Sequence, residues 1–368
     1  MTTRKLVIGL CALLIAPLTL AKEAPGQVGS VFVIAFENHN LTQPYRPWGD
    51  KPILGNEAAP YMNSLMTPGN PNATQTAYAK AYYNVGVHVH PSEANYIWAE
   101  AGTNFGVHTD ADPSKEHGNA LSGVDHLTAQ LNRAGIPWKN YQEDIQYTQS
   151  PTISAMGPGP VNAYNGTPMY GYLVKHNPMA FFADTNNQNV YPLERLFVDL
   201  ENNTTGRYNW ITPDLFNDAH NSVHDGFTYH GEHYRGDQSG VAAADHFLSV
   251  VVPKIMASSA YKANGVIIIW WDEAEGGDDV NHPIPEIIIS PLAKGNAYAS
   301  SVPMNHSSDL KTMEEIFRLP ALDNPIPANE TSVTGKGYNT VKSVNDLSDL
   351  FVPGAIPSTF GTAATGSN

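Results

Sequence analysis

The chain has 368 residues, of which 42% are hydrophobic, 10% aromatic and 15% charged. This composition excludes a disordered chain, a collagen-like repeat and a coiled coil, and it predicts a folded globular protein. Acidic residues outnumber basic ones by 35 to 20, which gives a net charge of −15. The sequence has no cluster of Lys and Arg, so we expect neither nucleic acid nor an anionic membrane as a partner.

The first 21 residues have the layout of a secretory signal peptide. Arg4 and Lys5 precede the apolar run 6–20, and the small residue Ala21 follows it. The run is short and is interrupted by Pro17, and we find no later segment with the about 20 apolar residues that a membrane helix needs. The sequence therefore predicts cleavage after Ala21, export to the periplasm or the medium, and no stable membrane insertion.

Strands and helices are predicted to alternate along the rest of the chain. In chain order we expect a strand at 31–36, a helix at 58–66, a strand at 77–87, helices at 92–101 and 122–134, a strand at 136–141, a loop at 150–169, a strand at 208–212, a loop at 220–233, a helix at 240–258, strands at 266–271 and 286–289, and a helix at 308–319. This alternation predicts an α/β/α sandwich with a mostly parallel central sheet. We expect a single catalytic domain over residues 22–368, with 150–169 as a loop or lid and 360–368 as a flexible tail.

Polar residues follow the predicted strands at several places. In an open parallel sheet, ligands bind beyond the carboxyl ends of the strands. The residues that follow the predicted strands are Glu37-Asn38, the turn from His90 to Asn95, the segment from Asp214 to His220, and Asp272-Glu273. The sequence therefore predicts an active site at this edge of the sheet.

The two acidic pairs indicate a metal site. Glu37-Asn38 and Asp272-Glu273 would bring three carboxylates and an amide oxygen into one small volume. A divalent cation relieves the repulsion between the carboxylates and gains four oxygen ligands. We expect one such ion, and the residues do not distinguish Ca, Mg, Mn and Zn. The alternative is that each pair caps a helix or faces water.

Ser92 lies at a predicted turn from strand to helix, where its hydroxyl is near helix amides that can receive an anion. This position suits a nucleophile, but a helix N-cap explains the local sequence equally well. Asp218 and His220 offer groups for phosphate contacts and proton transfer. His176 precedes a proline turn, and His306 lies at the start of the last predicted helix.

Taken in order, these segments resemble the bacterial phosphoesterase family that includes acid phosphatases and phosphatidylcholine-type phospholipases C, a branch of the alkaline-phosphatase-like superfamily. The resemblance rests on VFVIAFEN (31–38), HPSEANY (90–96), KHNP (175–178), WITPDLFNDAH (210–220), VIIIWWDEAEGGD (266–278), PEIIISPLAKG (285–295) and NHSSDLKTMEEIF (305–317). The chain departs from the family pattern at Ala94, where proline is usual, and in the stretch WWDEAEGG. The resemblance implies an alkaline-phosphatase-like fold.

The resemblance also implies hydrolysis of a phosphate ester through a phosphoserine intermediate, with Ser92 as the nucleophile. The expected metal ligands are Glu37, Asn38, Ser92, Asp272 and Glu273. His220 is expected to protonate the leaving alkoxide. The expected contacts to the phosphate are Asn95, His176, Asp218 and His306, with His306 at the rim of the pocket.

We expect a small phosphomonoester as the substrate. The chain lacks the long C-terminal extension of the phospholipase C branch, and its acidic surface does not favour anionic membranes. One alternative is a phosphodiesterase of the phospholipase C type. Another is a non-catalytic secreted protein in which the carboxylates form a structural calcium site and Ser92 only caps a helix. The sequence gives no indication of the oligomeric state.

Overall fold

The computed structural model describes residues 26–47, 49–327 and 344–357. The predicted signal peptide and the predicted tail at 360–368 lie outside the described residues. The predicted domain limits therefore stay predictions.

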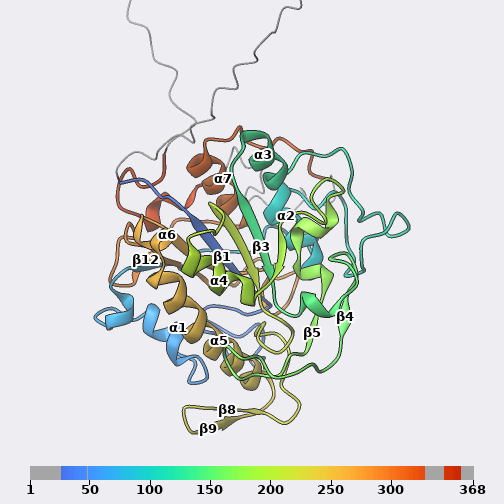
Figure 1. Ribbon diagram of the computed structural model, residues 1–368. Helices are drawn as coiled ribbons and strands as arrows, with labels where there is room; N and C mark the ends of the chain where they lie inside the picture. The colour runs from blue at the N-terminus through green and yellow to red at the C-terminus, as the bar shows by residue number, and fades with distance from the viewer. Residues whose placement is uncertain (1–25, 48, 328–343, 358–368) are drawn as a thin grey trace, which may run out of the picture.

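A central sheet organises the described part of the chain (Figure 1). Its eight strands, in spatial order, are β12 (Tyr298–Ser300), β2 (Thr76–Ala79), β11 (Glu286–Ile289), β10 (Val266–Trp271), β1 (Val31–Phe36), β7 (Tyr208–Thr212), β3 (Trp138–Gln142) and β6 (Val190–Pro192). Only β11 in this sheet runs antiparallel to its neighbours, β10 and β2. The predicted α/β class with a mostly parallel sheet is confirmed.

The central strands are buried on both faces, which explains their continuous apolar sequences. In β1, Val31, Val33 and Ala35 belong to one hydrophobic core, while Phe32 and Phe36 belong to the core on the opposite face. The residues of β10 alternate between the same two cores. This alternation follows from the two-residue period of a strand.

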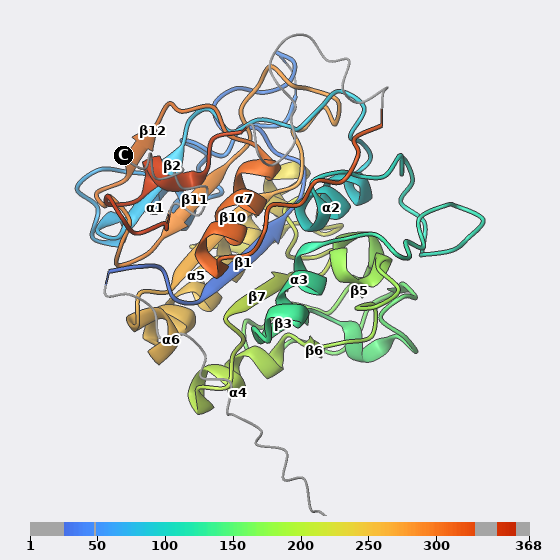
Figure 2. The same ribbon diagram turned by 90° about the horizontal axis from the view of Figure 1, so that it is seen from above.

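Helices cover both faces of the sheet. One face is covered by α2 (Ser92–Ala101), α3 (Leu127–Ala134) and α7 (His306–Phe317). The other face is covered by α1 (Pro60–Leu65), α4 (Glu194–Asn202), α5 (Asp237–Ala257) and α6 (Ser259–Lys262). Viewed from above, α2, α3 and α7 lie in front of the sheet and α5 lies behind it (Figure 2). The predicted three-layer sandwich is therefore present.

The helix α5 is longer and more apolar than we expected of any segment after the leader. Among the described residues, it is the helix long and apolar enough to cross a membrane, with a mean hydropathy of 1.3 over its best window. However, 61% of that window is buried inside the fold. Val241, Phe247 and Val251 of α5 pack in the core beneath the sheet. Burial in this core accounts for the apolar composition of the helix.

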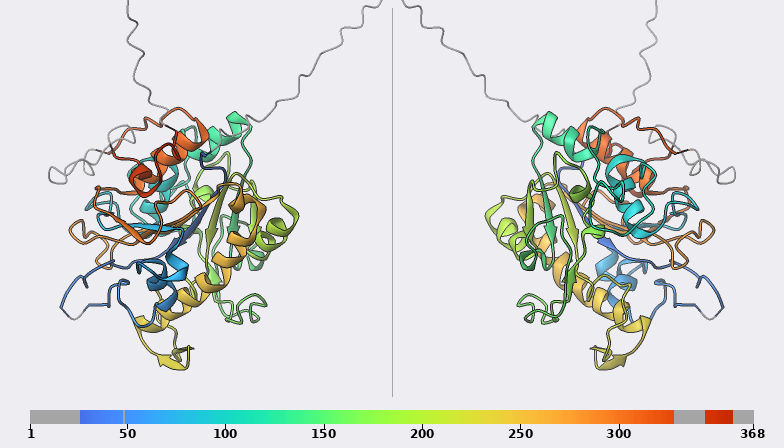
Figure 3. Two further views of the ribbon diagram at one scale, coloured as in Figure 1. Left: turned by 90° about the vertical axis from the view of Figure 1, so that its left-hand side faces the viewer. Right: turned by 90° about the vertical axis from the view of Figure 1, so that its right-hand side faces the viewer.

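Two predicted segments differ most from the structure. The strand expected at 77–87 ends at Ala79, and the following residues turn towards the start of α2. The loop expected at 220–233 contains a hairpin of β8 (Phe227–Tyr229) and β9 (Glu232–Tyr234). This hairpin projects at the lower end of the molecule in both views of Figure 3. His230 and Gly231 both have positive φ, at 50° and 87°, as a two-residue turn between such strands requires.

The expected loop at 150–169 is confirmed over most of its length. It contains the short strand β4 (Ala155–Met156), which pairs with β5 (Gly171–Tyr172). The last helix begins earlier than expected, at His306, because the Asn305 side chain caps it by accepting from Ser307 N. The helix expected at 122–134 begins only at Leu127.

Gly240 of α5 allows the close approach of the segment that follows β7. A Cβ atom at this position would lie 2.5 Å from Asn221 O and 3.0 Å from Ala219 O. We predict that Gly240→Ala lowers the free energy of unfolding by about 1–3 kcal/mol, because the helix and this backbone must move apart. Urea unfolding monitored by circular dichroism measures the change.

Ser249→Ala, on the same helix, is the control for the Gly240 substitution. The Ser249 hydroxyl donates only to the carbonyl of His246 in its own helix, so we expect a change within about 0.5 kcal/mol. Equal stability of Gly240→Ala and the wild type would contradict the close packing of α5 against residues 219–221.

Candidate active site

Two of the predicted acidic residues lie side by side where β1 and β10 end. These strands are parallel, and Phe36 is in register with Trp271, so Glu37 and Asp272 follow at neighbouring positions. Asp272 N donates to Phe36 O at 3.1 Å, and Asn38 N donates to Asp272 Oδ1 at 3.1 Å. Both carboxylates are fully buried. The sheet therefore brings the predicted residues to one place.

Ser92 points at this carboxylate pair. It is the first residue of α2, and its Oγ donates to Glu37 Oε2 at 2.9 Å. The N-cap position of α2 belongs to Pro91, and no side chain caps the helix. The hydroxyl of Ser92 therefore bonds Glu37 and does not cap the helix. This excludes the alternative that Ser92 is only a helix cap.

A lysine and a histidine approach Glu37 from the 3₁₀ turn η3 (Val174–His176). Lys175 Nζ lies 3.9 Å from Glu37 Oε2 and 3.2 Å from Asp110 Oδ2. His176 Nε2 lies 3.1 Å from Glu37 Oε1, and its ring stacks on Tyr96. Lys175 is not among the site residues predicted from the sequence, although the motif KHNP contains it.

The charges in this cluster fix the ionisation of its members. Burial opposes ionisation of Glu37, but His176 and Lys175 overcome it and hold the pKa of Glu37 well below its ordinary value. Burial likewise disfavours the charged form of Lys175, yet Glu37 and Asp110 raise its pKa above the ordinary value. Burial, together with the charges of Glu37 and Glu273, raises the pKa of Asp272 well above its ordinary value.

Several oxygen atoms in the cluster lack partners. Among the described residues, Glu37 Oε1, Asn38 Oδ1 and Asp272 Oδ2 are buried and accept no hydrogen bond. His176 Nε2 is close to Glu37 Oε1, but the two groups are not oriented to form a hydrogen bond. An unsatisfied buried acceptor costs about 1–3 kcal/mol, and a divalent cation would satisfy all three. These residues therefore fit the predicted metal.

The described ranges contain no group of three or more His, Cys, Asp and Glu side chains placed to hold a metal ion. The unpaired oxygens at the end of β1 and β10 come from only two carboxylates, and the third comes from the amide of Asn38. The oxygen-rich, sulfur-free character of this set suits a hard or borderline cation.

Glu273, a predicted metal ligand, is engaged by neighbouring side chains. Its Oε1 accepts from Asn38 Nδ2 at 2.7 Å, and its Oε2 accepts from Asn95 Nδ2 at 3.0 Å. His90 Nδ1 lies 3.0 Å from the same Oε2. Glu273 could ligate a metal only by giving up some of these bonds. In this structure it orients the amide of Asn38 and leaves the Asn38 oxygen unpaired.

Asn95 was predicted to contact the phosphate, but in this structure its amide group is directed into the protein. Asn95 is fully buried, and its Nδ2 donates to Val89 O and to Glu273 Oε2, both at 3.0 Å. No amide hydrogen is left for a phosphate oxygen. Asn95 therefore positions Glu273.

Asp218 and His220 lie beside the cluster after β7. The carbonyl of Asp218 accepts from Glu37 N at 2.9 Å, which ties the two segments together. Its carboxylate accepts from His220 N at 3.0 Å and from Asn221 N at 3.3 Å. Burial and the charge of Glu37 raise the pKa of Asp218 to about 8. The structure brings both predicted residues to the site.

His306 was predicted at the rim of the pocket, but it lies in the interior. Its ring is fully buried below the site, Nε2 contacts the carbonyl of Asp272, and Nδ1 lies 2.7 Å from the Tyr82 hydroxyl. Burial lowers the pKa of His306 to about 3. Both ring nitrogens are used within the protein, so His306 positions Asp272 and does not contact a phosphate.

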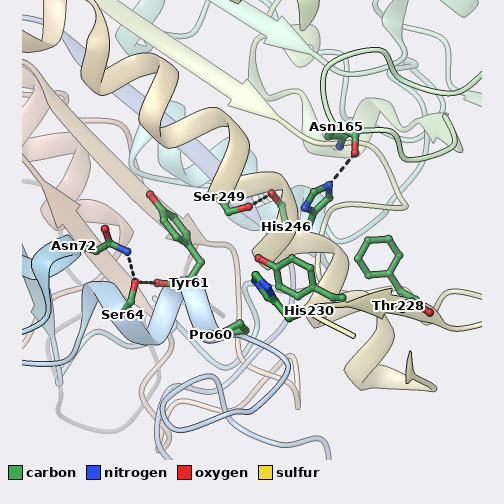
Figure 4. A pocket seen from close by; sticks show the side chains of 11 residues that line it. Pro60, Tyr61, Ser64, Asn72, Asn165, Thr228, His230, His246 and Ser249 are labelled. Atoms are coloured by element: carbon green, nitrogen blue, oxygen red, sulfur yellow. Dashed lines mark hydrogen bonds between the residues drawn. The ribbon is translucent and has the colours of Figure 1, made fainter. Parts of the chain in front are cut away.

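A separate cavity of about 770 Å³ lies between α1, α5 and the β8–β9 hairpin (Figure 4). Its lining includes Tyr61, Asn165, His230 and His246, and His246 Nε2 bonds the carbonyl of Asn165. The cavity shares no residue with the cluster around Ser92, and no Asp, Glu, Lys or Arg lines it. Although this cavity is large, it is therefore separate from the candidate active site.

Three further buried carboxylates anchor the loop at 150–169 beside the site. Tyr170 N donates to Asp214 Oδ2 at 2.6 Å, and Gly171 N donates to Asp144 Oδ2 at 2.7 Å. Asn162 and Tyr164 of the loop both bond Glu143 Oε1. Burial raises the pKa of Glu143 to about 7, and it raises the pKa values of Asp214 and Asp144 as well.

In this site a buried serine hydroxyl donates to a carboxylate, and a lysine and a histidine lie beside it. Such an arrangement is typical of an ester hydrolase that acts on an anionic group. The chain belongs to the Phosphoesterase family, which matches it over residues 72–320. The matched range includes Ser92, Lys175, Asp218 and Asp272. The protein is therefore a hydrolase of phosphate esters, and the family resemblance of its motifs is confirmed.

Phosphatases are similar to this chain in sequence. It is 25% identical over 268 residues to a phosphatidylinositol-3-phosphatase of Mycobacterium tuberculosis, and the match covers 73% of each chain. It is also 25% identical over 277 residues to a probable acid phosphatase of Kluyveromyces lactis, covering 70% of this chain and 58% of that one. A phosphate-repressible acid phosphatase of Penicillium chrysogenum is 22% identical, over 53% of this chain and 40% of its own length.

Two solved structures are similar in outline. A protein in the alkaline phosphatase superfamily from Vibrio parahaemolyticus gives a TM-score of 0.46 at 12% identity, over 79% of this chain and 67% of its own. The lipoteichoic acid synthase LtaP of Listeria monocytogenes gives a TM-score of 0.48 at 11% identity, over 80% of this chain and 73% of its own.

We predict that the stability of the protein depends on pH through the three carboxyl groups that anchor the loop, those of Glu143, Asp144 and Asp214. Their pKa values are higher in the folded protein than in the unfolded chain, so their stabilising contribution is complete below the unfolded pKa of about 4 and is lost as pH rises through the folded values. We predict that Asp214→Asn reduces the fall in melting temperature between pH 5 and pH 8. Differential scanning fluorimetry over this range measures the slope.

Asp225→Asn is the control for this measurement, because the Asp225 side chain is 95% exposed. It should keep the wild-type slope. If Asp214→Asn also keeps the wild-type slope, the buried carboxyl groups do not govern the stability of the loop at these pH values.

Proposed function

We propose that the protein is an exported, metal-dependent phosphomonoesterase that works through a phosphoserine intermediate on Ser92. One observation carries this proposal: the Ser92 hydroxyl lies 2.9 Å from Glu37 Oε2, beside unpaired buried oxygens and a lysine. The names of the curated relatives, which are all phosphatases, support a monoester over a diester.

The proposed metal site consists of Glu37, Asn38 and Asp272, with Ser92 Oγ next to them. A divalent cation held there supplies positive charge that lowers the pKa of a nearby hydroxyl and stabilises the phosphate oxygens. Glu273 supports this site through Asn38, and His306 supports it through the carbonyl of Asp272.

The side chains of the protein perform the remaining tasks. Glu37 accepts the hydrogen bond of Ser92 and so directs the hydroxyl towards the substrate. Lys175 stays protonated beside Glu37 and offers its charge to the phosphate, as phosphoryl transfer requires. His176 lies on the same side and contacts the phosphate in the proposed complex. As Ser92 Oγ attacks the phosphorus atom in line with the leaving oxygen, its proton passes to Glu37 Oε2 and the bond from phosphorus to the leaving oxygen breaks; Glu37 returns this proton to Ser92 when phosphoserine is hydrolysed.

His220 completes the cycle in the proposed mechanism. It donates a proton to the leaving alkoxide and then takes a proton from the water that hydrolyses phosphoserine. Asp218 fixes the backbone of His220 through the bond at 3.0 Å. The substrate is a small phosphate ester, and the predicted signal peptide at 1–21 carries the protein to the periplasm or the medium. The non-catalytic calcium-binding alternative finds no support in a family of hydrolases.

Ser92→Ala tests the nucleophile. We predict that kcat for p-nitrophenyl phosphate falls by at least about a thousandfold, because a reaction that depends on a covalent intermediate loses its attacking atom. The melting temperature should stay close to that of the wild type. Ser122→Ala, at an exposed serine, is the matched control and should retain full activity.

Activity of Ser92→Ala at the wild-type level would show that Ser92 is not the nucleophile. The same assay with bis(p-nitrophenyl) phosphate compares monoester with diester. A higher kcat/KM for the diester would favour the phosphodiesterase alternative over the proposed phosphomonoesterase.

Chelation tests the metal. We predict that EDTA abolishes turnover and lowers the melting temperature, because the buried oxygens of Glu37, Asn38 and Asp272 lose their partner. Adding back Ca²⁺, Mg²⁺, Mn²⁺ or Zn²⁺ singly identifies the ion that restores both. Asp272→Asn should bind this ion at least about tenfold more weakly by calorimetry. An unchanged metal affinity in Asp272→Asn would contradict the ligand set.

A further inference from the structure

A cavity of about 340 Å³ opens beside the proposed catalytic residues. It lies between the loop at 150–169 and the segment that follows β7. Most of its wall is apolar, formed by Pro158, Pro168, Tyr170, Leu215, Phe216 and Val223. Leu215 and Phe216 are buried, whereas Asp225 and His224 are more than nine-tenths exposed at its outer side.

One wall of this cavity is hydrogen-bonded to a residue of the catalytic cluster, and the other precedes Lys175 in the chain. The loop wall ends at Tyr170, a few residues before Lys175. The other wall contains Asn221, whose backbone N and side-chain Nδ2 both lie 3.3 Å from the Asp218 carboxylate. Leu215 N bonds the carbonyl of Gly171 at 3.4 Å and joins the two walls. The cavity therefore begins one side chain away from Asp218.

The loop that forms one wall also exposes large apolar side chains. Eight large hydrophobic side chains are exposed in the described structure, and five of them lie between positions 147 and 170, in the loop or directly beside it, namely Tyr147, Ile153, Met156, Val161 and Tyr170. Their exposed fractions reach 65% at Met156. This segment carries β4 and leads into β5, which lie side by side in Figure 1. A gathering of exposed apolar surface around a cavity is typical of a binding site for an apolar group.

We propose that this cavity receives the alcohol part of the substrate and selects phosphate monoesters of apolar alcohols, those with an alkyl or aryl group. This inference rests on the proposed function, because it places the phosphate at Ser92. An apolar group in the cavity is removed from water against Leu215, Phe216 and Val223. A polyol gains little there, because its hydroxyl groups lose water and meet a mostly apolar wall.

The test compares two monoesters of aliphatic alcohols, n-hexyl phosphate and glycerol 2-phosphate. We expect kcat/KM of the wild-type protein to be at least about tenfold higher for n-hexyl phosphate, as the burial of several methylene groups allows. In Tyr170→Ser and Val223→Ser the ratio of the two kcat/KM values should fall by about three- to tenfold. Val198→Ser, at a 47% exposed valine on α4, is the control and should leave both values unchanged.

The outcomes separate this inference from the proposed function. Equal kcat/KM for the two esters, or an unchanged ratio in both cavity variants, would overturn the apolar subsite while the phosphatase activity itself stands. If the wild-type protein hydrolyses neither ester with any of the four metal ions, the proposed function fails, and the inference that depends on it fails too.

Discussion

The burial of two carboxylates at adjacent strand ends is the constraint on which the rest of this site depends. Parallel pairing of β1 with β10 brings Glu37 and Asp272 together in a fully buried place. Lys175 and His176 offset part of this charge, and the pKa of Glu37 stays low as a result. The pKa of Asp272 rises, and three oxygens remain unpaired. In the proposed function, a divalent cation relieves the repulsion that remains between these carboxylates.

A surrounding layer of hydrogen-bonded side chains holds the cluster in place. Glu273 and Asn95 orient Asn38, while His306 bonds the carbonyl of Asp272 from below. The carboxylate of Glu273, the amide nitrogen of Asn95 and both ring nitrogens of His306 are bonded within the protein. The Ser92 hydroxyl, in contrast, has Glu37 as its partner and faces the unpaired oxygens. In the proposed mechanism, this difference separates the attacking group from the groups that position it.

Much of this arrangement could be predicted from the sequence. The strands β1 and β10 have the predicted bounds because their apolar runs are uninterrupted and are buried on both faces. The order of motifs also predicted which residues meet. The partner of each polar atom could not be predicted, because it depends on side-chain directions: Asn95 is near the site but turns to Glu273. The hairpin at 227–234 escaped prediction because its turn depends on positive φ at His230.

The central claim is that Ser92 carries the phosphoryl group during turnover. A trapping experiment tests this claim directly. The metal-loaded protein is mixed with excess p-nitrophenyl phosphate at a pH that slows hydrolysis of the intermediate. The reaction is then quenched in acid, and the peptides are mapped by mass spectrometry. The account predicts one phosphoryl group on the peptide that contains Ser92, and none when the substrate is omitted. Phosphate on a different residue, or steady turnover with no phosphorylated peptide on the timescale of a single cycle, would contradict it.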